Sequence, residues 1–122
     1  MPRPLLAALL VLIALALALG AIGAHVVPDE GREQWRQAVF WHAVAAVALL
    51  ALSGAWERLA PPGRTLGVVL ALAGAVAFCG ALYVQALTGT PPVPMLAPIG
   101  GTAQIAGWLV LAAAAMRWRL AP

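Results

Sequence analysis

The sequence contains no lysine, one cysteine and only four acidic residues among its 122 positions. Its seven basic residues are all arginine, charged residues make up 9% of the chain, and hydrophobic residues make up 64%. So few charges cannot cover the surface of a water-soluble domain of this size. The single cysteine, Cys79, excludes an internal disulfide. The arginines are scattered and form no basic patch, so we do not expect nucleic-acid binding.

Charged residues are missing from three long stretches, at 4–24, 37–56 and 65–116. A membrane-spanning helix needs about 20 residues, so the last stretch is too long for one crossing. Four prolines within 88–98 prevent a continuous helix there. We therefore predict an all-α integral membrane protein, a single domain over 1–122 that forms an up-down antiparallel bundle of four transmembrane helices. The predicted helices are about 4–24, 37–57, 65–87 and 98–117.

The arginines divide unequally between the two ends of such a bundle. Four crossings place both termini on the side that carries more arginine, whereas the other side also carries Asp29, Glu30 and Glu33. The positive-inside rule therefore predicts cytoplasmic N- and C-termini. The arginines of the predicted inner side are Arg3, Arg58, Arg64, Arg117 and Arg119, and those of the outer side are Arg32 and Arg36.

The first uncharged stretch ends in GAIGAH, at 20–25. Ala21 and Gly23 are small enough to precede the cleavage site of a secretory signal. However, the apolar run is long for the core of a signal peptide and long enough to span a bilayer. We expect a retained helix whose small residues let a neighbouring helix come close.

Small residues recur every four positions along the predicted helices, which lets two backbones approach each other. This matters in lipid because apolar burial gives a helix no preference for a partner. In a chain this rich in alanine and glycine, chance produces such repeats of small residues as readily as a requirement for helix packing does. The predicted packing positions are Gly20, Ala24, Gly67, Gly80, Gly100, Gly101 and Gly107.

The charged segment before the second predicted crossing also has helical spacing. Trp35, Val39 and His42 share one face of it, and Asp29 can cap its start. We expect residues 28–41 to form a water-exposed or interfacial prefix to the second helix.

Four polar residues are the main candidates for a site. His25 and His42 lie at the outer ends of the first two predicted helices, and Tyr83 and Gln104 fall in the outer half of the bundle. Buried polar groups in lipid must find partners, so we expect the four to form one cluster. Such a cluster can be a pocket for a head group, a quinone or a proton, or a hydrogen-bonded clasp that fixes helix order. Haem b or a metal at the two histidines is an alternative.

The connection before the fourth predicted helix is apolar and uncharged although it should lie at the outer surface. An exposed apolar loop indicates contact with lipid head groups or with another protein. The candidate contact residues are Pro92, Pro94, Met95 and Pro98.

Several segments, taken in order, resemble one family. They are GAIGAH at 20–25, AVFWHA at 38–43, VAFCGALYVQALTG at 76–89 and PIGGTAQIAGW at 98–108. They are similar to the YgdD / transmembrane-protein-256 family of small four-helix membrane proteins, a domain of unknown function (423). Ile22, Cys79 and Ala97 depart from the residues usual in that family. The resemblance implies a four-helix fold and a bacterial inner-membrane or mitochondrial location, but no activity.

Two hypotheses of function follow. The first is a structural or accessory subunit that packs against a larger membrane complex, with lipids and other membrane protein subunits as partners. No predicted helix carries a central charged residue, the usual mark of an ion or proton pathway. The second is a cofactor or small-ligand binder (haem, metal, quinone or lipid) at the four polar residues. We expect no enzyme, because neither a Ser-His-Asp nor a Cys-His arrangement is indicated, and no required cofactor.

Overall fold

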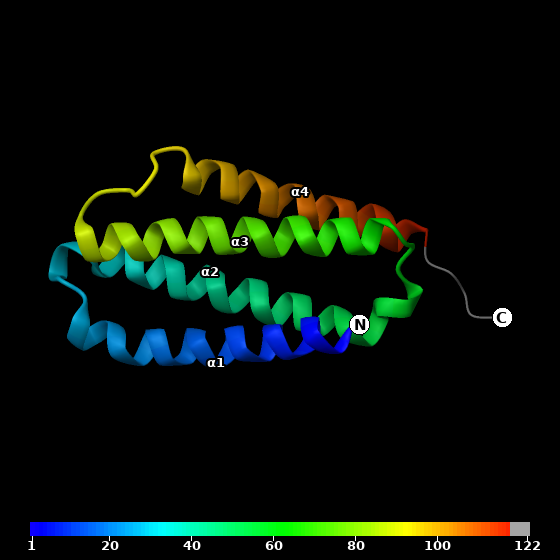
Figure 1. Cartoon of the computed structure of the whole chain (residues 1–122), viewed down its shortest axis with the longest axis horizontal. Helices are drawn as coiled ribbons and strands as arrows, with labels where there is room; N and C mark the ends of the chain where they lie inside the picture. Colours follow the sequence, from blue (N-terminus) through cyan, green and yellow to red (C-terminus); the bar gives the residue numbers. More distant parts are fainter. Residues whose placement is uncertain (118–122) are drawn as a thin grey trace.

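The computed structural model describes residues 1–117 and shows four long helices joined by short connections (Figure 1). Each long helical segment is apolar and long enough to cross a membrane, and this described part of the chain contains no strand. The predicted all-α, four-helix architecture is thereby confirmed. Arg119 lies outside the described residues. The elements are α1 (Arg3–Val26), η1 (Asp29–Gly31), α2 (Arg32–Ala51), η2 (Leu52–Arg58), α3 (Gly63–Thr88) and α4 (Leu96–Met116), where η denotes a 3₁₀ helix.

The second helix differs most from its predicted bounds. It begins at Arg32, five residues before the predicted start, and the 3₁₀ turn Asp29–Gly31 runs directly into it. No side chain caps α2, so the cap predicted from Asp29 is wrong, and the Asp29 carboxylate instead pairs with Arg32 at 3.0 Å. At the other end the helix tightens into η2 from Leu52 onward. Every residue of α2 therefore lies farther from the outer end of the helix than the prediction places it.

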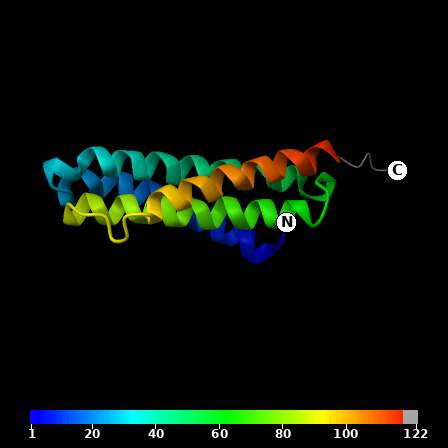
Figure 2. The same cartoon turned by 90° about the horizontal axis from the view of Figure 1, so that it is seen from above.

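Each helix packs mainly on its neighbours in sequence, α1 on α2, α2 on α3 and α3 on α4. The N-terminus and the C-terminal end of α4 lie at the same end of the bundle, and α1 and α4 lie on opposite sides of the α2–α3 pair in Figure 1. Figure 2 shows α4 crossing α3 in the view from above. The largest apolar core gathers residues from all four helices near the end that holds the termini, among them Leu9, Leu49, Val68 and Leu111.

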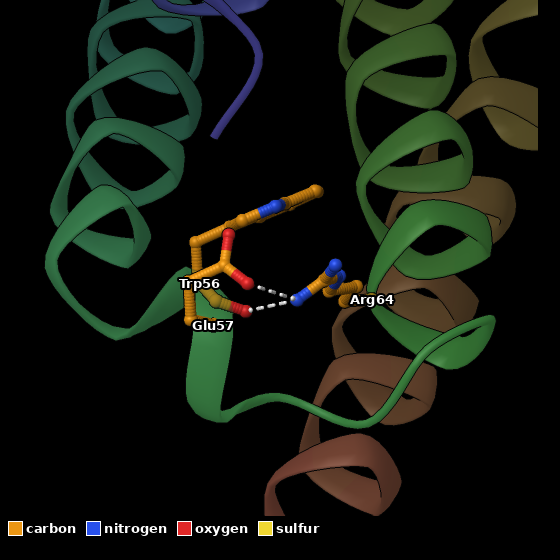
Figure 3. Close-up of polar contacts among 3 residues, drawn as sticks. All are labelled: Trp56, Glu57 and Arg64. Atoms are coloured by element: carbon orange, nitrogen blue, oxygen red, sulfur yellow. Dashed lines mark hydrogen bonds and ion pairs between the residues drawn. The ribbon is translucent and has the colours of Figure 1, made fainter.

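Arg64 fixes the corner between η2 and α3 at this end. Its Nη1 donates to the main-chain oxygen of Trp56 at 2.9 Å and pairs with the Glu57 carboxylate at 3.4 Å (Figure 3). The guanidinium also lies 4.9 Å from the centre of the Trp56 ring. A planar cation with several donors can serve all three groups at once. Arg64 therefore links the end of η2 to the start of α3, together with the main-chain bond from Arg64 N–H to the carbonyl oxygen of Ala60.

The closest contact in the bundle joins α3 to α4 through two pairs of facing glycines. Gly67 lies against Gly107 and Gly74 against Gly100, and the two glycines on each helix are seven residues apart. A β-carbon added to Gly74 would lie 2.6 Å from the carbonyl oxygen of Gly100, and one added to Gly100 would lie 2.9 Å from the carbonyl oxygen of Gly74. Close backbone packing with weak Cα–H···O contacts therefore holds α4 on α3.

Other predicted packing positions make no such contact. A β-carbon on Gly80 would meet nothing within 4 Å, and one on Gly101 would meet only the ring of Phe78 at 3.6 Å. A β-carbon on Gly20 would reach a neighbouring side chain at an ordinary 3.4 Å, and Ala24 is exposed. The reason is geometric: a repeat of small residues marks a stripe of the helix, whereas only part of each stripe meets a partner.

We expect Gly74→Ala to lower the free energy of unfolding by about 1–3 kcal/mol, the usual cost of overpacking. The added methyl group meets main-chain atoms of Gly100 and Gln104, which cannot move aside without separating the two helices. Gly80→Ala on the same helix is the matched control, and it should raise stability by up to about 1 kcal/mol because alanine favours helix over glycine. Titration with sodium dodecyl sulfate in detergent micelles measures the free energy of unfolding of both variants. Equal stability of the two variants would contradict the close packing of α3 on α4.

Candidate functional site

His42 and Tyr83 are joined by a hydrogen bond between α2 and α3. The imidazole Nδ1 and the phenolic oxygen are 2.9 Å apart, and the two rings are nearly perpendicular, at 82°. His42 is only 9% exposed. It lies ten residues after Arg32, so it is about 15 Å along α2 from the outer end of that helix. The bond therefore links two polar side chains within the membrane-spanning part of the bundle, where each needs a partner.

Trp35 covers the outer side of this pair. Its indole Nε1 donates to the main-chain oxygen of Leu19 on α1 at 2.9 Å, and its ring meets Tyr83 edge-on with centroids 4.8 Å apart. Gly23 lies directly against the indole, where a β-carbon would overlap Nε1. Helices α1, α2 and α3 therefore meet at Trp35. Trp35 is not among the predicted site residues, although its helical spacing predicts that it shares one face with His42; that shared face is the signal in the sequence.

A cavity of about 170 Å³ lies between α1, α2 and α3 and includes both His42 and Tyr83 in its lining. An apolar cavity of about 150 Å³ in another protein holds one benzene molecule, so this space is the size of one substituted ring. The cavity is partly open, and no charged side chain lines it. Its other lining residues are Leu12 and Leu15 on α1, Ala45 and Ala46 on α2, and Leu72, Ala75, Val76, Cys79 and Gly80 on α3.

The second imidazole nitrogen of His42, Nε2, is buried and has no hydrogen-bond partner within residues 1–117. The main chain of Leu12 faces the ring from α1 without completing a hydrogen bond. If the Tyr83 hydroxyl donates to Nδ1, the imidazole proton resides on Nε2, and one donor is unpaired. The other tautomer leaves both Nε2 and the hydroxyl hydrogen unpaired. The first arrangement leaves fewer unsatisfied buried groups, so we assign an N–H donor to Nε2.

The structure does not bring His25 to this pair. His25 is exposed in the last turn of α1, whereas the cavity touches α1 at Leu12 and Leu15. Leu15 is ten residues from His25, or about 15 Å along the helix. The predicted pairing of His25 with His42 is therefore not formed, because α2 starts earlier than predicted and carries His42 deeper into the bundle.

Gln104 also lies apart from the pair. Its main chain abuts Gly74 on α3, nine residues and thus about 13 Å along that helix from Tyr83. The half-buried Gln104 side chain makes no hydrogen bond within the described chain. The predicted cluster of four polar residues thus reduces to the two that are bonded, His42 and Tyr83.

The same geometry bears on the haem and metal alternatives. Two histidines about 15 Å or more apart along the bundle cannot ligate one haem iron. Across residues 1–117, no three histidine, cysteine or acidic side chains gather where they could hold a metal ion. The arrangement is instead that of a hydrogen-bonded pair beside an apolar cavity.

The fold and this site define a class: a small four-helix integral membrane protein with a histidine–tyrosine bond among its helices. Comparison with known sequences gives the family. The profile of the family described as "Protein of unknown function (DUF423)" matches residues 19–101, and the chain belongs to that family. The resemblance to the YgdD family is thereby confirmed.

Curated relatives cover most of this chain. The UPF0382 membrane protein YwdK of Bacillus subtilis is 32% identical over 109 residues, which are 85% of this chain and 89% of the relative. The UPF0382 inner membrane protein YgdD of Escherichia coli is 33% identical over 104 residues, which are 82% of this chain and 79% of the relative. No solved structure matches the chain. The names of these relatives state a membrane location and no activity.

Proposed function

We propose that this protein binds a small membrane-soluble molecule with a hydrogen-bond acceptor, such as a quinone carbonyl, in the cavity between α1, α2 and α3. One observation carries the proposal: His42, whose buried Nε2 has no hydrogen-bond partner within residues 1–117, is one of the few polar residues that line a mostly apolar cavity. A buried donor without a partner costs about 1–3 kcal/mol. A ligand carbonyl at Nε2 would remove that cost.

The lining of the cavity supports an uncharged ring as the ligand. Its volume of about 170 Å³ suits one substituted ring, and its walls offer alkyl side chains and no charge. The space exists because α2 and α3 present Ala45, Ala46, Ala75 and Gly80 where larger residues would fill it. Since the cavity is partly open between spanning helices, a ligand dissolved in the hydrocarbon can enter it directly.

Equilibrium dialysis of tetramethyl-1,4-benzoquinone against the protein in detergent micelles tests the proposal. Gly80→Leu should abolish binding, because its side chain would fill the cavity at a position where an added β-carbon meets nothing within 4 Å. Gly54→Leu is the matched control: Gly54 has the same open surroundings but lies in η2, away from the cavity, and this variant should bind as the native protein does.

His42→Phe in the same dialysis separates the hydrogen bond from the cavity. The ring shape is kept and the donor is lost, so we expect about tenfold weaker binding, in line with a net hydrogen bond of about 1–1.5 kcal/mol. Binding of the quinone by Gly80→Leu at native affinity, or no binding by the native protein, would refute the proposal.

The loop between α3 and α4 favours a second function, that of an accessory subunit. Val93 and Met95 are 54% and 58% exposed, and Pro92, Pro94 and Pro98 beside them are exposed as well. This exposed apolar surface carries no charge, which supports contact with a protein partner. The proposal is independent of the cavity.

A photo-crosslinking amino acid at position 93 is expected to give a protein adduct of defined mass in native membranes. The same amino acid at position 17 is the control, because Leu17 is 72% exposed in the middle of α1, where lipid is expected to surround it. If both positions give only lipid adducts, the loop has no protein partner.

We propose that the chain lies in a bacterial inner membrane with both termini in the cytoplasm. Arg3, Arg58, Arg64 and Arg117 lie at the end that holds the termini, whereas the other end has only Arg32 and Arg36. This distribution follows the positive-inside rule, and a relative from Escherichia coli is named as an inner membrane protein.

A membrane-impermeant maleimide reports this orientation. In a Cys79→Ala background, Val93→Cys should react in intact spheroplasts, and Pro2→Cys should react only after lysis. The reverse pattern would place the termini outside. Replacement of Cys79 removes the only native thiol, which is buried.

A further inference from the structure

A second cavity, also of about 170 Å³, lies at the outer part of the contact between α1 and α2. It is separate from the His42 cavity and differs in chemistry, because two cations line it. Gly20, Gly23 and Ala24 of α1 form one side, and Arg32, Trp35 and Arg36 of α2 form the other. We name it the Arg36 groove.

The two arginines differ in how their charges are balanced. Arg32 pairs with Asp29 at 3.0 Å and donates to the main-chain oxygen of Ala24 at 3.4 Å. Arg36, one helical turn further along the same face, has neither an acidic partner nor a hydrogen bond within residues 1–117. The side-chain amide of Gln37, the next residue in sequence, donates a hydrogen bond to the nearby Glu33 carboxylate at 3.4 Å. The groove therefore contains one guanidinium that makes no ion pair within residues 1–117.

The depth of Arg36 shows what can balance this charge. Arg36 lies four residues into α2, about 6 Å from the start of that helix, and is therefore near the outer boundary of the membrane-spanning segment. The head-group region of a bilayer extends several ångströms beyond the hydrocarbon core on each side. At that level the abundant anion is the phosphodiester of a phospholipid, which accepts two parallel N–H bonds from a guanidinium.

The α1 side of the groove leaves room for such a group. Gly20 carries no side chain and Ala24 only a methyl group, so the surface beside Arg36 is hollow at these two residues, whereas the Trp35 indole covers Gly23. The Trp35 indole, fixed by its hydrogen bond to Leu19, forms a rigid wall. An arginine that merely extended into the head-group region would not need this hollow.

We propose that the Arg36 groove binds the phosphodiester of one phospholipid in the leaflet at this end of the bundle. Arg36 makes the principal contact, Arg32 adds the second cation, and the glycerol region of the lipid rests on Gly20 and Ala24. The proposal does not depend on what occupies the His42 cavity, because the two cavities share no lining residue.

Thermal unfolding in lipid-free detergent micelles, with phosphatidylglycerol titrated in, tests the groove. We expect the native midpoint to rise with lipid and the apparent Kd of Arg36→Gln to be at least about tenfold weaker, as for loss of a charge-assisted contact. Arg3→Gln, at an exposed arginine of the opposite end, is the matched control and should keep the native Kd. Inorganic phosphate at the same concentrations should not move the midpoint.

A second variant separates the groove from general charge attraction. Ala24→Leu fills the hollow at an exposed position and keeps both arginines, so it should weaken lipid binding as Arg36→Gln does. Three results would each overturn the proposal: the same Kd for Arg36→Gln and Arg3→Gln, native affinity in Ala24→Leu, or stabilisation by inorganic phosphate equal to that by the lipid.

Discussion

The backbone contact between α3 and α4 determines how the other helices are arranged. Lipid gives two apolar helices no preference for each other, so a lasting contact needs close packing. Two reciprocal glycine pairs supply it, Gly67 with Gly107 and Gly74 with Gly100. Because one face of α3 is occupied by α4 in this way, the residues of its other face, such as Cys79 and Tyr83, are directed toward α1 and α2.

The two sides of α3 therefore differ in kind. Toward α4, main-chain atoms meet without room for a single methyl group at the paired glycines. Toward α1 and α2, the helices enclose a cavity and are linked by specific polar contacts, the His42–Tyr83 bond and the Trp35 bond to Leu19. A binding function is compatible with the second side, because space and an unpaired donor occur together there. The first side has neither.

The sequence was enough to predict the number of helices, because charges and prolines stand only between or beside them. It also contained both members of the polar pair, since polar side chains within lipid must find partners. The sequence could not exclude His25 from the polar cluster, because the depth of His42 in the bundle depends on where α2 begins. That start depends on a tertiary contact: Gly31 lies directly against the carbonyl of Ala86 on α3, which sets the level of α2.

The same limit applies to the glycines. The seven-residue spacing of Gly67 and Gly74, matched by Gly100 and Gly107, can be seen in the sequence. Twelve glycines are present, however, and only the antiparallel pairing of α3 with α4 shows which of them face each other. Gly80 belongs to the same helix as Gly74, but a β-carbon added to it would contact no other atom within 4 Å. The sequence alone does not distinguish the two glycines.

The placement of α1 has a consequence for the order of assembly. This helix packs chiefly on α2, and much of its length faces outward. Synthesis from the N-terminus produces α1 first, yet Trp35 and the other residues that hold it belong to segments made later. During synthesis α1 is retained in the bilayer by its own hydrophobicity. Among the helices described, α1 can thus reach its final position only after α2 has followed it into the membrane.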